Sequence, residues 1–89
     1  MSTTVYGMDI TAARDLVRVM NSDADVINQL TAQLTQQLEA TPWYGPDAQR
    51  FTSDWQGQYV PALQNVVAAL QENATILSQQ ADDQERASS

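Results

Sequence analysis

The sequence predicts an all-α fold, an antiparallel hairpin of two long helices that forms a single domain over residues 1–89. Two observations support this prediction. The turn-forming run Trp43-Tyr44-Gly45-Pro46 stands almost at the midpoint of the chain. On both sides of it, apolar residues recur every three or four positions, which is the spacing of an amphipathic helix. Two helices joined by so short a loop are typically antiparallel neighbours.

The first helix is expected over about residues 9–40. Asp9 can cap its N-terminus, because a side-chain oxygen there accepts a hydrogen bond from the free N–H groups of the first turn. The apolar arc of this helix covers roughly half of the helical wheel, more than one neighbouring helix needs. We therefore expect contacts with two neighbours. The arc consists of Ala13, Leu16, Met20, Ile27, Leu30, Leu34 and Leu38, flanked by Val17, Val19, Ala24 and Val26.

The turn is expected over residues 41–45. Pro42 disfavours helical geometry at Thr41, so the first helix should end just before this residue. Gly45 tolerates backbone angles that are closed to other residues, and Pro46 suits the first position of a helix, where its missing N–H is not needed. The second helix should therefore begin at Pro46.

The second helix is expected over about residues 46–82, followed by a frayed tail over 83–89. Pro61 interrupts it, since a proline removes one hydrogen bond and crowds the carbonyl of Gly57. We expect a bend near residues 57–61, with two shorter helices as the alternative. The apolar side is predicted to hold Ala48, Phe51, Trp55, Tyr59, Ala62, Leu63, Val66, Leu70, Leu77 and Ala81.

Two polar residues, Asp23 and Asn73, fall on the apolar arcs. Each could lie at the edge of its arc and stay hydrated. Alternatively, Asn73 could set the register or the identity of a partner in a helix bundle, as a single buried asparagine does in coiled coils.

Composition argues against several classes of function. The net charge is −7, the only basic side chains are four arginines, and there is no cysteine or histidine. A nucleic-acid ligand needs a clustered basic face, and a membrane-spanning helix needs a long apolar run, so we expect neither nucleic-acid binding nor membrane insertion. Nucleophile–base pairs and a glycine-rich phosphate loop are missing, so we expect no enzyme, no cofactor and no metal site. No basic segment followed by an apolar stretch opens the chain, so no cleavable signal peptide is expected.

The central Trp43-Tyr44-Gly45 between two amphipathic helices, in a chain of this size, resembles the WXG family of small type VII secretion substrates, related to the early secreted antigenic target proteins. The resemblance covers nearly the whole chain, and Trp43 and Gly45 would form the turn motif. It implies that the hairpin pairs into a four-helix bundle, as a homodimer or as a heterodimer with another WXG-type protein or domain. The residues expected in the core or the dimer interface are Leu16, Met20, Ile27, Leu34, Phe51, Trp55, Tyr59, Val66, Leu70 and Leu77.

The resemblance also implies a route. Such proteins are cytoplasmic before export and leave the cell without a cleavable leader, through a membrane machine driven by an ATPase. Their export signal is typically Tyr-x-x-x-Asp/Glu after the second helix. In this chain, the residues four positions before Asp82, Asp83 and Glu85 are Ser78, Gln79 and Ala81. This departure favours a partner that carries the signal and engages the ATPase.

A second hypothesis is a helical adaptor or chaperone-like partner that stays inside the cell and covers an apolar helix of a larger effector protein. Detection of the chain in the culture supernatant, dependent on the secretion ATPase, would separate the exported protein from this adaptor.

Overall fold

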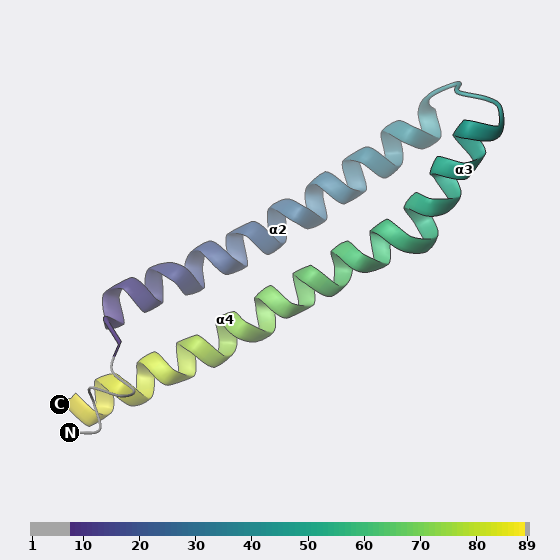
Figure 1. Ribbon diagram of the computed structural model, residues 1–89. Helices are drawn as coiled ribbons and strands as arrows, with labels where there is room; N and C mark the ends of the chain where they lie inside the picture. Colours follow the sequence, from purple (N-terminus) through teal and green to yellow (C-terminus); the bar gives the residue numbers. More distant parts are fainter. Residues whose placement is uncertain (1–7, 89) are drawn as a thin grey trace.

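The computed structural model describes residues 8–88. These residues form α2 (Ile10–Ala40), α3 (Pro46–Asp54), a π-helical segment η1 (Trp55–Tyr59) and α4 (Val60–Ser88), and they contain no strand. α3, η1 and α4 follow one another without a break and run back along α2 (Figure 1). The predicted all-α helical hairpin is therefore confirmed.

The ends of α2 are set by local chemistry. Asp9 is its N-cap, as the sequence predicts, and the Asp9 carboxylate accepts a hydrogen bond of 3.0 Å from the N–H of Ala12. Thr41 is the C-cap and has extended backbone angles, the geometry that Pro42 imposes on the preceding residue. The N–H of Thr41 still donates to the carbonyl of Leu38, at 3.4 Å. α2 therefore ends at Ala40.

The turn depends on a glycine. Gly45 is the N-cap of α3 and has φ of +113°, a backbone conformation that residues with a Cβ rarely adopt. Pro46 follows in the first turn of α3, where its missing N–H is not required. The carbonyl of Gly45 accepts a hydrogen bond of 3.0 Å from the N–H of Gln49. These features let the chain reverse between Ala40 and Pro46.

The π-helical segment η1 ends two residues before Pro61. In this segment the N–H of Val60 donates to the carbonyl of Trp55, five residues back instead of four. Pro61 has no N–H to donate to Gly57, and a π turn is one of the local adjustments by which a helix continues through such a gap. The long helix changes direction in this region without being interrupted (Figure 1).

The π turn also moves the side of the second helix that faces α2. After the buried Trp55, the next residue that faces α2 is Val60, five positions further along the chain. Tyr59 and Val66, which the sequence pattern places on the buried side together with Ala62, are instead exposed. A count at 3.6 residues per turn misses this shift, because the wider turn rotates every later residue about the helix axis.

The two helices meet along a narrow seam whose most buried residues are small. Ala24, Ala74 and Ala81 are at most 1% exposed, whereas no large side chain in the described part of the chain is completely buried. Small side chains let two helices approach closely but remove little apolar area from water. The radius of gyration is 19.4 Å, against about 12 Å for a compact domain of this length. The hairpin is a thin rod that leaves much of its apolar surface exposed.

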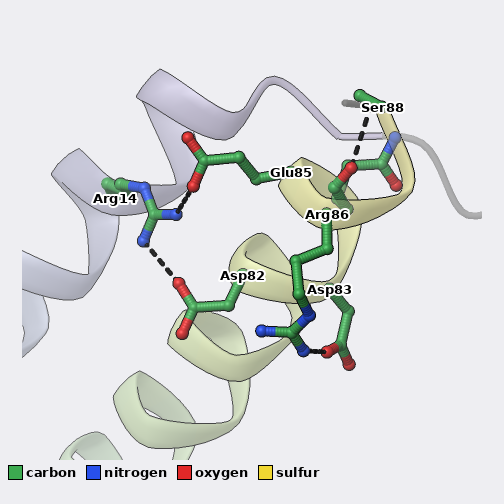
Figure 2. Close-up of polar contacts among 7 residues, drawn as sticks. Arg14, Asp82, Asp83, Glu85, Arg86 and Ser88 are labelled. Atoms are coloured by element: carbon green, nitrogen blue, oxygen red, sulfur yellow. Dashed lines mark hydrogen bonds and ion pairs between the residues drawn. The ribbon is translucent and has the colours of Figure 1, made fainter.

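The C-terminal end of α4 differs from the prediction. The sequence analysis expects residues 83–89 to fray, but α4 remains helical through Ser88. Residue 89 lies outside the described residues. Three ion pairs hold this end: Arg14 of α2 binds both Asp82 and Glu85, and Arg86 binds Asp83 within α4 (Figure 2). The prediction was wrong because it considered the tail without α2.

Candidate functional site

An exposed apolar stripe runs along α2 beside the seam. The side chains of this stripe are between 44% and 58% exposed. Each stands one position before a half-buried residue of the seam, and successive helical residues are about 100° apart. The stripe therefore lies roughly a quarter turn away from the seam. It consists of Leu16, Val19, Val26, Leu30 and Leu34.

A matching stripe runs along η1 and α4. Its large members, Tyr59, Val66 and Ile76, are exposed, as are Ala62 and Ala69 between them. Each again stands one position before a seam residue. The corresponding seam residues are Val60, Leu63, Val67, Leu70 and Leu77.

The two stripes lie on the same side of the hairpin. Both are displaced from the seam by one residue toward the N-terminus, and because the helices are antiparallel with their seams facing, the two rotations lead to one side. An ion pair checks this geometry. Arg14 and Asp82 each stand one position after a seam residue, Ala13 and Ala81, and their side chains form an ion pair of 3.0 Å on the opposite side of the hairpin. We call the surface made by Leu16, Val19, Val26, Leu30, Leu34, Tyr59, Ala62, Val66, Ala69 and Ile76 the apolar face.

The opposite side, the polar face, has a different composition. A shallow groove of about 370 Å³ opens on it, where Asn28, Ala32 and Gln36 of α2 border Gln64 of α4. Only small or polar side chains lie one residue after the seam positions. They include Arg14, Arg18, Asn21, Asp25, Asn28, Ala32 and Gln36 of α2, and Gln64, Ala68, Gln71, Thr75, Asp82 and Glu85 of α4.

Asp23 and Asn73 interrupt the apolar face. They stand directly before Ala24 and Ala74, two of the most buried residues of the seam, so they share the displacement of the two apolar stripes. Both residues are exposed in the hairpin, as the simpler reading of the sequence expects. The amide N–H of Asn73 donates to the carbonyl of Ala69 in its own helix, at 2.8 Å.

The tip of the hairpin carries an aromatic cluster. The ring of Phe51 lies 6.1 Å from that of Trp43, 6.3 Å from that of Trp55 and 6.5 Å from that of Tyr59, measured between centroids. Trp55 is also tied to α2, because its indole N–H donates to the hydroxyl of Thr35 at 2.9 Å. Trp43 is about half exposed, and Tyr44 is 85% exposed beside an open pocket of about 480 Å³. The tip therefore presents aromatic side chains on a rigid turn.

The opposite end of the rod is closed by charge. Figure 2 shows the guanidinium of Arg14 between two carboxylates of α4, with 3.0 Å to Asp82 and 2.7 Å to Glu85. The pKa of Arg14 is raised above its ordinary value, chiefly by the hydrogen bond with Asp82 and also by Glu85. The stabilisation from this shift is present in full at neutral pH and is lost as the pH rises through the raised pKa of Arg14.

The structure divides the predicted core or interface residues into two groups. Trp55 is buried, and Met20, Ile27, Phe51, Leu70 and Leu77 are half-buried. Leu16, Leu34, Tyr59 and Val66 lie on the apolar face. The predicted turn residues Trp43 and Gly45 stand at the tip, with Gly45 in the special backbone conformation described above.

The sequence analysis did not predict two sets of contacts between the helices. The Arg14 ion pairs join residues far apart in the chain, and the Trp55–Thr35 hydrogen bond crosses from η1 to α2. A register for the two helices, counted outward from the turn, would have brought Thr35 and Trp55 close together. The signal for Arg14 is its position beside Ala13, a seam residue.

Among residues 8–88, no helix is both long and apolar enough to cross a membrane, and no group of three or more acidic side chains could hold a metal ion. Comparison of the chain with protein-family models, with curated proteins and with solved structures found no match.

Proposed function

We propose that this chain is a small, non-enzymatic component of a type VII secretion system, a WXG-type hairpin that is exported, alone or with a partner, after pairing into a four-helix bundle. The apolar face carries this proposal. Its large aliphatic and aromatic side chains stay in contact with water in the isolated hairpin, although the seam beside them is closed. A contiguous exposed apolar surface is characteristic of a protein–protein interface.

The tip supports the same proposal. Trp43 and Gly45, the turn motif of the resemblance, lie on the turn, where Gly45 has φ of +113° and the ring of Pro46 restricts the next φ. Trp43 contacts Phe51 and stays about half exposed. An aromatic side chain held in this way loses little conformational freedom when a second protein covers it.

The acidic end of α4 bears on whether this chain or its partner carries the export signal. Asp82 and Glu85, acidic residues in the last turns of α4, are both engaged by Arg14. No tyrosine precedes either of them by four residues. The proposal therefore includes a partner that supplies the signal and engages the ATPase.

The test is export from a host that has a type VII system. The tagged chain is expressed with and without a functional secretion ATPase, and the culture supernatant is probed together with a cytoplasmic marker that controls for lysis. We expect the chain in the supernatant only when the ATPase works. Retention in the cell with a working ATPase would contradict the proposal and favour the adaptor that is never exported.

A pair of variants at the tip sharpens this test. Trp43→Ala should reduce export, whereas Tyr44→Ala, which removes a more exposed aromatic residue from the same turn, should leave export unchanged. Circular dichroism of both purified variants confirms that the hairpin still folds. Export that persists after deletion of every candidate partner would contradict the partner-borne signal.

A further inference from the structure

The structure brings Asp23 and Asn73 to the same level of the hairpin. Arg14 and Asp82 are in contact. Asp23 lies nine residues after Arg14, and Asn73 lies nine residues before Asp82, so both are the same number of residues closer to the middle of the rod. The groove on the polar face gives the same answer. Ala32 and Gln64 border it together, and nine residues from each lead again to Asp23 and Asn73. The two polar side chains therefore lie at about the same level along the rod, on neighbouring helices of the apolar face.

Together they offer hydrogen-bond acceptors. Asp23 forms no hydrogen bond or ion pair with any described residue, and an ionised carboxylate can only accept. Asn73 donates one of its two amide N–H groups to the carbonyl of Ala69, and its side-chain oxygen remains as an acceptor. A surface with a carboxylate and an amide oxygen at the same level, surrounded by apolar side chains, suits a lysine or arginine from another protein.

A second copy of this chain cannot supply that cation from its apolar face. The chain has four arginines and no lysine or histidine. Arg14 and Arg18 lie on the polar face, and Arg50 and Arg86 pair with Asp47 and Asp83 outside the apolar face. Two copies packed face to face, with their rods overlapping fully, would bring two Asp23 carboxylates to the middle of one interface. They would also join two chains of net charge −7.

We propose that the apolar face binds a second helical hairpin that is not another copy of this chain and that places a lysine or arginine against Asp23 and Asn73. This inference rests on the proposed function and names the partner of the same surface. The apolar face supplies the contact area, and Asp23 selects the partner, because a buried carboxylate without a cation opposite it opposes association. Asn73 positions the incoming cation through its side-chain oxygen.

The test uses a charge-reversed copy of the chain as the probe. Sedimentation equilibrium measures the association of the wild type alone, of Asp23→Lys alone, and of their equimolar mixture. We expect the mixture to form a one-to-one dimer about tenfold or more tighter than either protein forms alone, because only the mixture pairs opposite charges at this position. Asp23→Asn, which removes the charge at nearly constant shape, should strengthen self-association by a similar factor.

Asp25→Lys is the matched control. Asp25 also has no partner among the described residues, but it lies on the polar face, so mixing this variant with the wild type should give no comparable gain. Circular dichroism shows whether each variant keeps its helical content.

Two results would overturn the inference: a wild-type homodimer as tight as the mixture, or an Asp25→Lys mixture as tight as the Asp23→Lys mixture. The first would identify a second copy as the occupant. If the chain is exported in an ATPase-dependent way, either result would contradict this inference but not the proposed function. If the chain is not exported but the mixture shows the expected charge preference, the proposed function fails and the inferred interface remains.

Discussion

The apolar face and the polar face of the hairpin are built from the same two helices. Residues one position before the seam form the apolar face, and residues one position after it form the polar face. On the polar face, Arg14 joins the helices through Asp82 and Glu85, and the surface between them is small or polar. On the apolar face, large side chains such as Leu30 and Tyr59 have no partner helix over them. The hairpin therefore devotes only a narrow seam to its own fold and leaves the wider part of its apolar arc for another chain.

The largest expected effect comes from placing charge on the apolar face. Val26→Glu combined with Leu30→Glu should weaken association with the Asp23→Lys protein by at least about 2 kcal/mol, because two further carboxylates would be buried without cations opposite them. Asn28→Glu combined with Ala32→Glu adds the same charge at the same spacing on the polar face and serves as the control. The measurement is sedimentation equilibrium against the Asp23→Lys protein. Equal losses for the two double variants would contradict the distinction between the faces.

The next effect concerns the seam. Ala24→Leu should destabilise the hairpin by about 1–3 kcal/mol, since Ala24 is fully buried and a larger side chain would push the helices apart. Ala32→Leu, at an exposed position of the same helix, should change the free energy of unfolding by no more than about 0.5 kcal/mol. Urea unfolding followed by circular dichroism gives both values. A seam that accepts leucine without loss would show that the helices are not closely packed there.

A smaller effect is expected at the tip. Trp55→Phe keeps the aromatic packing but removes the hydrogen bond to Thr35, so the free energy of unfolding should fall by about 0.5–1.5 kcal/mol. In a Thr35→Val background the same change should cost less, because its partner is already gone. If the cost is the same in both backgrounds, the hydrogen bond does not contribute.

The smallest effect is expected at the charged end. Arg14→Gln should increase hydrogen exchange in the last turns of α4, over residues 82–88, because the link to α2 is lost. The difference from the wild type should shrink as salt is added, since these side chains are exposed to solvent. Arg50→Gln, which removes an ion pair within α3, should leave exchange over 82–88 unchanged.

Short-range chemistry made much of the fold predictable from sequence. The Asp9 cap, the extended Thr41 before Pro42 and the turn at Gly45-Pro46 each depend on residues that are neighbours in the chain. The broad apolar arc of the first helix also predicted contacts beyond a single neighbour. In the structure, one part of that arc faces α4 and another is exposed. Periodicity identified Asp23 and Asn73 as polar residues on apolar arcs without relating them to each other.

The remaining features of the molecule depend on how the two helices are placed against each other. The π turn at η1 rotates Tyr59 and Val66 out of the seam, and the register of the rod brings Asp23 level with Asn73. Arg14 keeps the end of α4 helical because it reaches across from α2. The helices, their turn and their amphipathic character could be predicted from the sequence, since these arise from interactions within a few residues. The division of the apolar arc into seam and apolar face required the relative rotation and register of two helices, which no local pattern specifies.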